Sequence, residues 1–370
     1  MRVLLLGATG SLGRRAAAEL LRQPEVEQLW LSGRDERAVS ELSRRFDHNS
    51  GRVHPLPLGL LDNPDLRTPD GPADVVASCA GPAYETEFAA ARAAVEAGSS
   101  YVSLGDDSGA VDDVFSLDAD ARAAGVTIVS GCGVSPGITN LLIAHATPDT
   151  GSVDTVDIAL ARSSAESEGF ATARHFLYEL SQEAVVIKDS RPQVKKAGSS
   201  PKLVFFPEPV GWVETFHCGH PEIDTLPMQY PNLSYLEFRL GLTERITMDT
   251  ARAFTATPLA RVERARRLFA TATAPVRPFL DRLPPKGPAW TAARVDVTTN
   301  NGSETISLGV ADKLVNFASV PLTLAALRVG RKEVAGPGVL SIEQAFDVSA
   351  FLHDLIKRGI GIARLEPRPV

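Results

Sequence analysis

Short apolar runs alternate with amphipathic stretches over roughly the first 150 residues, as expected for a βαβ-type domain. The apolar runs, rich in Val, Leu, Ile and Ala, predict buried strands at 2–6, 26–32, 73–81, 100–105 and 126–131. Apolar residues three and four apart predict helices at 11–23, 35–46, 85–98, 110–125 and 136–146. Strands that alternate with helices of this length predict a parallel sheet with helices on both faces.

The pattern changes in the second half of the chain. Runs rich in β-branched and aromatic residues predict strands within 152–162, 202–227 and 234–242, and a hairpin over 294–310. Helical periodicity returns at 169–182, 259–272, 316–330 and 341–359. We expect mobile loops at 192–201 and 275–288, which are rich in Pro and Gly. The predicted fold class is α/β: a Rossmann-type doubly wound parallel sheet plus a second α+β domain with a mainly antiparallel sheet.

The length, net charge and cysteine content of the chain limit the classes of protein to which it can belong. A chain of 370 residues suggests two domains. The net charge of −7 argues against a nucleic-acid partner, and no apolar run approaches the roughly 18 residues of a membrane span. Three scattered cysteines suggest neither a metal site nor a disulfide framework, so we expect no metal and a cytoplasmic location.

The segment GATGSLGRRA, residues 7–16, joins the first predicted strand to the first predicted helix. Glycines in this context permit a sharp turn, let backbone N–H groups approach a pyrophosphate, and let helix and strand pack closely. The helix N-terminus adds unsatisfied N–H donors for the phosphates. The expected cofactor-binding residues of this loop are Gly7, Thr9, Gly10, Ser11, Leu12 and Gly13.

The end of the second strand bears on the choice between NAD and NADP. An NAD site usually places a carboxylate there, whereas this chain has Ser32 and Arg34, which can donate to a 2′-phosphate. Asp35 follows, but its position fits a helix N-cap. We therefore expect NADP, with NAD less favoured.

Three later loops lie where the carboxyl ends of parallel strands are predicted, which is where ligands bind in such sheets. Cys79, Ala80, Gly81 and Pro82 offer small residues beside the ribose and nicotinamide, and Tyr84 follows them. Asp106 and Asp107 can hold a substrate ammonium or relay a proton, or else cap the next helix. Cys132 and Ser135 lie in the loop GCGVSPG, where Cys132 is either a substrate-facing thiol or an inert buried one. The candidate catalytic residues are Tyr84, Asp106, Asp107, Cys132 and Ser135.

Other enzyme families share glycine loops of this kind, and the sequence tests two of them. Short-chain dehydrogenases need Tyr-x-x-x-Lys. The residues four after the five tyrosines are Phe88, Gly105, Gln182, Ser234 and Arg239, so that family does not fit. A semialdehyde dehydrogenase that uses Cys132 as nucleophile stays an alternative. Ser135 stands where the Asn of its Cys-x-x-Asn pattern is expected.

Six segments, spread from one end of the chain to the other, resemble the saccharopine dehydrogenase-like (saccharopine reductase-type) family. They are GATGSLGRRAAAELL, ADVVASCAGP, AAVEAGSSYVSLGDD, AGVTIVSGCGVSPGITNLL, FPEPVGWVETFHCGHPE and GVLSIEQAFDVSAFLHDLIKRGI. The resemblance implies an NAD(P)-binding Rossmann domain over 1–147 with returning C-terminal helices over 312–370. It also implies an α+β substrate and dimerisation domain over 148–311, and a homodimer.

The same resemblance implies reversible reduction of an imine that links an amine or amino acid to a carbonyl compound, with a small, amino-acid-like substrate. Many relatives carry Asp where this chain has Ser135, so a cofactor-binding protein without catalysis is a further alternative. Candidate anchors for a substrate in the second domain are Arg174, His175, Glu208, His217 and His220.

Overall fold

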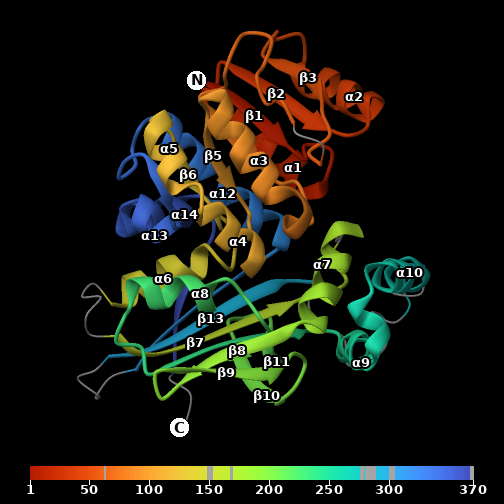
Figure 1. Cartoon of the computed structure of the whole chain (residues 1–370), viewed down its shortest axis with the longest axis vertical. Helices are drawn as coiled ribbons and strands as arrows, with labels where there is room; N and C mark the ends of the chain where they lie inside the picture. Colours follow the sequence, from red (N-terminus) through yellow and green to blue (C-terminus); the bar gives the residue numbers. More distant parts are fainter. Residues whose placement is uncertain are drawn as a thin grey trace. The chain divides into compact units, whose positions relative to one another are not determined.

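The computed structural model describes residues 1–61, 64–147, 153–166, 170–275, 279, 289–299 and 305–366. Over these residues the chain divides into two compact units (Figure 1). Unit 1 comprises Met1–Ile138 and Val315–Leu355, and unit 2 comprises Thr139–Leu314 and Ile356–Val370. The sequence analysis placed one domain over 1–147 with 312–370 and a second over 148–311. These domain limits stay a prediction. Within the described residues, no helix is both long and apolar enough to span a membrane.

Unit 1 is built on a parallel sheet. Its strands are β1 (Arg2–Leu6), β2 (Gln28–Gly33), β3 (Val53–Pro57), β4 (Val75–Ser78), β5 (Ser100–Ser103), β6 (Thr127–Val129) and β15 (Gly338–Leu340). Within the described residues they form one seven-stranded sheet in the order β15-β6-β5-β4-β1-β2-β3. The strand order therefore reverses between β1 and β4, as in a doubly wound dinucleotide-binding sheet.

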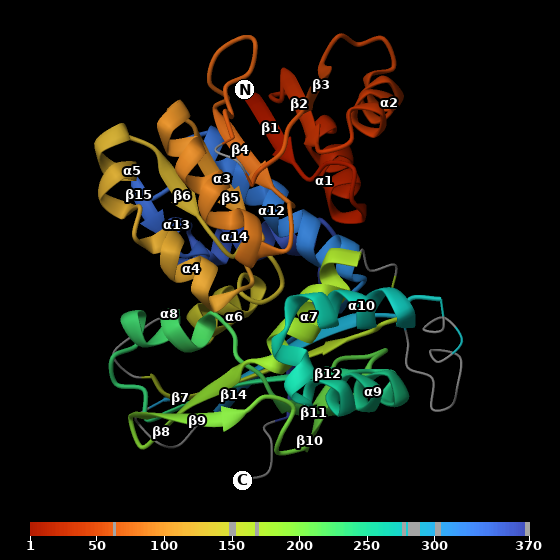
Figure 2. The same ribbon diagram turned by 45° about the vertical axis from the view of Figure 1, so that its right-hand side comes forward.

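Helices cover the two faces of this sheet. They are α1 (Ser11–Leu21), α2 (Glu36–Asp47), α3 (Ala83–Ala97), α4 (Ser108–Phe115), α5 (Asp118–Ala124), α12 (Leu314–Gly330), α13 (Ile342–Ala345) and α14 (Val348–Lys357). One core joins Leu4, Val76 and Ile128 to the alanine-rich face of α3, because alternate strand residues point to the same side. Helices α1 and α12 lie side by side, joined where the Ser319 hydroxyl donates to the Leu12 carbonyl at 2.8 Å (Figure 2).

The alternation predicted for the first part of the chain is confirmed, with local differences. The predicted helix 110–125 is two helices, α4 and α5, which are separated at Ser116 and Leu117. The sequence analysis missed β3, whose two prolines are tolerated because the strand lies at the sheet edge. It also missed β15, a strand of three residues.

Unit 2 is built on a mixed, mostly antiparallel sheet. Its strands are β7 (Val153–Arg162), β8 (Glu183–Lys188), β9 (Arg191–Lys196), β10 (Lys202–Phe206), β11 (Gly211–His217), β12 (Tyr235–Leu242), β13 (Thr291–Thr299), β14 (Thr305–Asp312) and β16 (Ile362–Leu365). The main path runs β10-β11-β12-β7-β13-β14-β16, with β8 and β9 attached to β12. The β12–β7 pair is parallel. The helices are α6 (Ile138–Ala146), α7 (Phe170–Ser181), α8 (Glu222–Gln229), α9 (Arg245–Thr255), the 3₁₀ helix η2 (Pro258–Arg261) and α10 (Glu263–Thr273).

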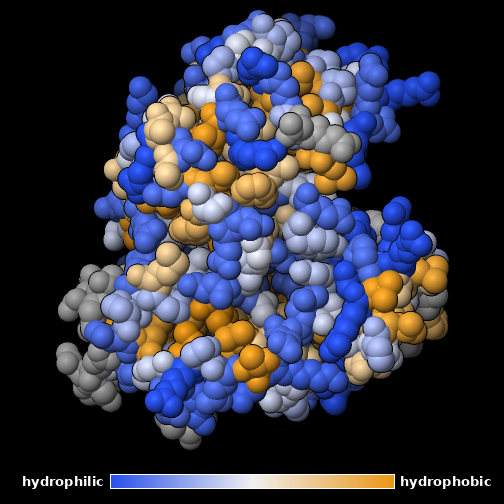
Figure 3. All heavy atoms as spheres, in the orientation of Figure 1, coloured by the Kyte–Doolittle hydropathy of each residue, from blue (hydrophilic) through white to orange (hydrophobic). Residues whose placement is uncertain are grey.

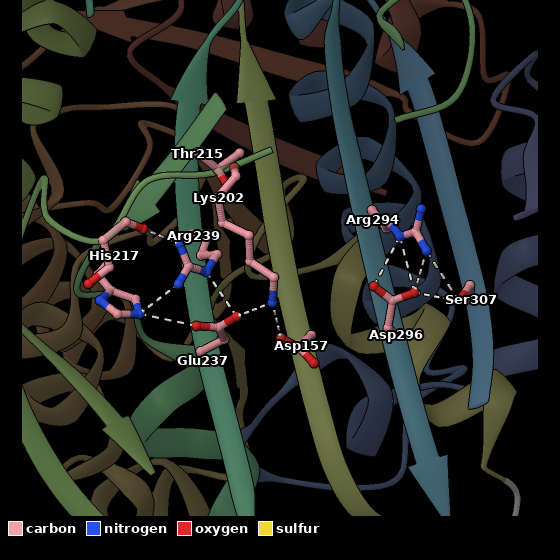
Figure 4. A network of polar contacts seen from close by, with 10 residues as sticks. Asp157, Lys202, Thr215, His217, Glu237, Arg239, Arg294, Asp296 and Ser307 are labelled. Carbon is pink, nitrogen blue, oxygen red and sulfur yellow. Dashed lines mark hydrogen bonds and ion pairs between the residues drawn. The ribbon is translucent and has the colours of Figure 1, made fainter. Parts of the chain in front are cut away.

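Strand β10 crosses one face of this sheet and is held there by two arginines. Arg239 on β12 donates to the Ser200 carbonyl at 2.7 Å, and Arg294 on β13 donates to the Phe205 carbonyl at 3.0 Å. Each arginine is neutralised by a buried carboxylate on its own strand, Glu237 at 2.8 Å and Asp296 at 2.7 Å (Figure 4). The charges are therefore paired, which is the condition for keeping them away from water.

Two expectations for the second half need correction. Residues 192–201, expected as a mobile loop, include most of β9, which pairs with β8 in an antiparallel hairpin. The sequence analysis missed β9 because its mostly polar residues lack the apolar alternation of a half-buried strand. The predicted helix 341–359 is divided into α13 and α14. The second predicted mobile loop, 275–288, and the turn at 300–302 lie almost entirely outside the described residues.

Candidate cofactor and active site

The glycine loop lies at the point where the strand order of unit 1 reverses. Gly7 follows β1 with φ at +71°, a conformation that glycine adopts without strain. A Cβ on Gly7 would lie 2.7 Å from the carbonyl carbon of Cys79, because the loops after β1 and β4 touch through their backbones. Ligands bind in such a crevice, outside the carboxyl ends of the strands.

The first turn of α1 is open to a ligand. The helix begins at Ser11, and its N-cap, Gly10, has no side chain to accept from the first N–H groups. Gly10 and Ser11 are exposed. A Cβ on Gly13 would lie 2.3 Å from the Gly7 carbonyl oxygen, so this close packing of loop and helix requires glycine. These features fit a pyrophosphate held by backbone N–H groups.

The two residues expected at a 2′-phosphate, at the end of β2, differ in their exposure to solvent. Arg34 is exposed, whereas Ser32 is 1% exposed. Arg34 is therefore the one of the two that reaches a phosphate from solvent. Asp35 is the N-cap of α2 and accepts from the Ala38 N–H at 3.1 Å, as its position predicts. That bond engages one of its carboxylate oxygens.

The loop after β4 has the open character expected beside a ribose or nicotinamide. Cys79 and Ala80 are partly exposed, and Gly81 is exposed. Pro82 is buried and is the N-cap residue of α3. Tyr84 is half-buried in the first turn of that helix.

The two aspartates after β5 differ in environment. Asp107 is the N-cap of α4 and accepts from the Ala110 N–H at 2.9 Å. Of the two roles left open for this residue, the structure therefore favours capping over catalysis. Asp106 is half-buried. It is the stronger candidate of the pair for contact with a substrate.

Cys132 does not fit the nucleophile expected of a semialdehyde dehydrogenase. Its side chain is fully buried and lies 3.5 Å from the Val129 carbonyl oxygen. Burial raises the pKa of the Cys132 thiol well above its usual range, and a protonated thiol is a poor nucleophile. Of the two roles left open for Cys132, its burial favours the inert thiol. Ser135, in the same loop, is 7% exposed.

A functional candidate that the sequence analysis missed lies beneath these loops. Glu87 on α3 is 2% exposed, and its carboxylate accepts from the hydroxyls of Tyr101 at 3.1 Å and Ser130 at 3.2 Å, and from Ser103. The sequence did contain an indication that Glu87 is buried. Glu87 shares the apolar stripe of α3 with Ala90, Ala91 and Ala94, so a charge there is buried.

Two of the five expected anchor residues, His175 and His220, lie in one buried cluster of unit 2. His175 and Glu179 on α7 lie 3.2 Å apart, Nε2 to Oε1, and both are buried. Burial alone would raise the pKa of Glu179. The charges of His175, His220 and Arg162 outweigh burial and lower it. Arg162, which the sequence analysis did not single out, therefore belongs to this buried cluster.

His220 lies at the same cluster. It stacks on Phe238 at 3.9 Å between ring centroids and is hydrogen bonded to Glu222, which also accepts from the Thr139 hydroxyl at 2.9 Å. We call Arg162, His175, Glu179, His220 and Glu222 the His175 cluster. Within the described residues, no three His, Cys, Asp or Glu side chains are placed to hold a metal ion.

The other three expected anchors lie elsewhere. Arg174 is paired with Glu263 on α10, and Glu208 is exposed in the turn between β10 and β11. His217 Nε2 lies 3.1 Å from Glu237 and 2.9 Å from Arg239, within the network of Figure 4. That network faces away from Phe238 and the His175 cluster, because neighbouring strand residues point to opposite faces.

Comparison with known proteins agrees with this geometry. Residues 3–129 match the model of the saccharopine dehydrogenase NADP-binding domain. The chain carries a saccharopine dehydrogenase-like NAD(P)-binding domain. The match supports a nicotinamide dinucleotide as the cofactor of this domain. This match confirms the family resemblance for the three of the six sequence segments that lie wholly within residues 3–129.

Solved structures resemble the chain over most of its length. Apo saccharopine dehydrogenase (L-Glu forming) from Saccharomyces cerevisiae matches with a TM-score of 0.66 at 13% identity, covering 99% of this chain and 100% of the yeast chain. This match shows a shared fold. A probable dehydrogenase from Thermotoga maritima gives a TM-score of 0.45 at 12% identity over 98% of both chains. Biliverdin reductase from Synechocystis gives 0.43 at 12% identity over 96% of both chains.

Proposed function

We propose that this chain is an NADP-dependent oxidoreductase that transfers a hydride to or from an imine linking an amino-acid-like amine to a carbonyl compound. The observation that carries the proposal is the backbone cradle at the reversal of strand order, formed by the loops after β1 and β4 around Gly7. The yeast enzyme of similar fold is a saccharopine dehydrogenase, which favours C=N chemistry.

The proposed preference for NADP rests on the end of β2. Arg34 is exposed there and can pair with a 2′-phosphate. The nearby carboxylate, Asp35, caps α2 through its Oδ1. An NAD site needs a carboxylate that accepts from the ribose 2′-hydroxyl, and the capping bond disfavours that role for Asp35.

Each part of the site then has a role. The N–H groups of Ser11, Leu12 and Gly13 bind the pyrophosphate, and the open loop after β4 adjoins the ribose and nicotinamide. The dinucleotide, when bound, supplies the hydride. Reduction of C=N also consumes one proton, and Asp106, half-buried after β5, is the carboxylate placed to hold it or to pair with a substrate ammonium. Tyr84 and Ser135 stay candidates for contact with substrate.

The proposed anchor for an amino-acid-like substrate is the His175 cluster. It holds one arginine and two histidines against two carboxylates, and its members are buried. Charged side chains are usually buried only where they are paired with opposite charges or belong to a functional site. A cluster that contains both positive and negative groups suits a substrate that carries both a carboxylate and an ammonium group.

Titration of NADPH and NADH against intrinsic fluorescence tests the cofactor assignment. We expect tighter binding of NADPH, and we expect Arg34→Ala to weaken NADPH by roughly tenfold while leaving NADH unchanged, since one charge-assisted pair is worth about 1.5 kcal/mol. Arg45→Ala, an exposed arginine in the last turn of the following helix α2, is the matched control. Tighter NADH binding, or equal effects of the two variants, contradicts the NADP assignment.

Oxidation of NADPH with mixtures of amino acids and oxo acids or aldehydes tests the reaction. Turnover that requires both an amine and a carbonyl partner supports imine reduction. Reduction of NADP+ by an aldehyde alone, abolished by Cys132→Ser, supports the semialdehyde dehydrogenase instead. Tight NADPH binding without oxidation by any mixture supports a cofactor-binding protein that has lost catalysis.

We further propose a homodimer in a cytoplasmic setting. The three cysteines are free, as a reducing compartment allows. Two exposed apolar surfaces of unit 2 are available. Trp212 on β11 is 64% exposed and Leu203 on β10 is 60% exposed. Leu268 on α10 is 70% exposed, and Figure 3 shows apolar residues on the surface near α9 and α10. We favour the Trp212 surface, because aromatic residues dominate interface energies. Sedimentation of Trp212→Glu should then show monomers, and Leu268→Glu should stay dimeric.

A further inference from the structure

Glu87 is a buried carboxyl that the proposed reaction does not itself use. Its oxygens are 3.1 Å from the Tyr101 hydroxyl and 3.2 Å from the Ser130 hydroxyl, and Ser103 donates a third hydrogen bond. The ionised carboxylate accepts all three bonds. The neutral acid must donate through one oxygen, so protonation forces at least one of these hydroxyls to turn its hydrogen away.

The carboxyl joins the two loops where the active site is proposed. Ser103 ends β5 and also accepts from the Gly105 N–H at 3.4 Å, whereas Ser130 follows β6. Gly105 packs directly on the cluster, because a Cβ there would lie 2.4 Å from the Ser130 hydroxyl and 3.1 Å from Glu87 Oε1. Asp106 is the next residue. A change at Glu87 therefore acts on the backbone beside a proposed substrate contact.

The surroundings of Glu87 bring its pKa close to neutral pH. Burial, helped by the charge of Asp106, raises the pKa of Glu87 to about 7, against the hydrogen bonds of its three hydroxyl donors. On the other sides lie Tyr101, whose own pKa burial raises well above its usual value, and the buried Cys132 thiol, on which the charge of Glu87 also acts. Glu87 thus exchanges its proton at a pH where its neighbours Tyr101 and Cys132 keep theirs.

We propose that Glu87 is a proton-linked positioning residue, which holds the loops after β5 and β6 and takes up a proton from solvent when the reduced dinucleotide binds at the adjacent strand ends. This inference rests on the proposed function. A bound anion disfavours a second negative charge nearby, and the effect is strong in a buried site. The oxidised nicotinamide ring is cationic and the reduced ring is neutral, so NADPH induces more proton uptake than NADP+.

Proton uptake on binding tests this directly. Calorimetric titrations of NADPH and of NADP+ in two buffers of different ionisation enthalpy give the number of protons bound at each pH. For the wild-type chain we expect up to about half a proton more with NADPH than with NADP+ near the pKa of Glu87. Protons bound by the 2′-phosphate cancel, because both dinucleotides carry it.

Three variants separate Glu87 from other titrating groups. Glu87→Gln keeps the shape and hydrogen-bonding capacity of the side chain, and it should abolish the difference between NADPH and NADP+. Glu85→Gln, an exposed carboxylate on the same helix, is the matched control and should keep it. Tyr101→Phe removes one donor to the carboxylate, so the pH of largest uptake should rise. Melting temperatures confirm that each variant is folded.

An unchanged uptake difference in Glu87→Gln overturns the proposal, as does equal uptake with both dinucleotides in the wild-type chain. Those results leave the proposed function standing, because NADPH still binds. Failure of the wild-type chain to bind either dinucleotide is a different result: it overturns the proposed function and removes the basis of the linkage with it.

Discussion

Gly105 lies directly against the carboxylate of Glu87: a Cβ added to Gly105 would be 3.1 Å from Glu87 Oε1 and 2.4 Å from the hydroxyl oxygen of Ser130. The contact brings the loop that carries Asp106 onto a buried, titratable group of α3. It also predicts that this position tolerates glycine only.

Gly105→Ala should therefore destabilise the chain by about 1–3 kcal/mol, the usual cost of overpacking a filled site. Gly109→Ala is the control, because a Cβ there meets only the Asp107 carboxylate at an ordinary 3.5 Å. That change lies in α4 and should be neutral or stabilising. Urea unfolding of both variants measures the costs, and equal stabilities would show that the Glu87 cluster yields easily.

The raised pKa of Glu87 makes stability depend on pH. The folded chain keeps this proton up to about pH 7, whereas an ordinary Glu releases it near 4.5. The folded state thus binds more protons over this interval, and the free energy of unfolding falls by about 3 kcal/mol as pH rises through it. Glu87→Gln should lack this loss. The fluorescence of Trp30, which lies in unit 1, follows the unfolding. A Glu87→Gln curve parallel to that of the wild type would contradict the assigned pKa.

Two glycines of the first loop should respond differently to alanine. Gly13→Ala places a Cβ 2.3 Å from the Gly7 carbonyl oxygen, so it should lower stability by about 1–3 kcal/mol even without ligand. Gly10 is exposed, and the nearest atom to its Cβ is 3.4 Å away. Gly10→Ala should therefore leave melting unchanged and weaken NADPH binding at least tenfold by crowding the pyrophosphate. Unimpaired binding by Gly10→Ala would argue against a phosphate at this turn.

The Arg294–Asp296 pair predicts a stability effect in unit 2. Arg294 is 2% and Asp296 is 4% exposed, so Arg294→Met removes the cation that neutralises a buried carboxylate and should cost about 3–5 kcal/mol. Adding Asp296→Leu should recover much of that loss. Arg191→Met, at an exposed position of β9, is the control and should change stability by less than about 0.5 kcal/mol. A double variant as unstable as the single one would mean that the arginine acts mainly through its bond to the Phe205 carbonyl.

Much of unit 1 could be predicted because each element carries its own signal. The apolar run of β1, the glycines after it and the Asp35 cap of α2 identify a strand–loop–helix unit without tertiary information. The strands β15 and β16 were not predicted, and each depends on a neighbouring strand for its hydrogen bonds.

The parts of the candidate site that the backbone forms could be predicted from the sequence. The roles of side chains that depend on burial were harder to predict. The loop from Gly7 to Gly13 follows from glycine spacing. The roles of Asp107 and Cys132 do not, because capping and thiol burial depend on what packs around them. The His175 cluster joins α7, α8 and the end of β7, which are far apart in sequence. Of its five members, the sequence analysis named only His175 and His220, as separate candidate anchors.

The central claim is that NADP binds at the carboxyl ends of the parallel strands, and a crystal structure of the NADP complex tests it most directly. The account predicts the pyrophosphate within hydrogen-bond distance of the backbone N–H groups of Ser11 to Gly13, and the 2′-phosphate against Arg34. A dinucleotide bound away from the loop after β1, or one whose ribose 2′-position is held by Asp35 with Arg34 turned to solvent, would contradict it.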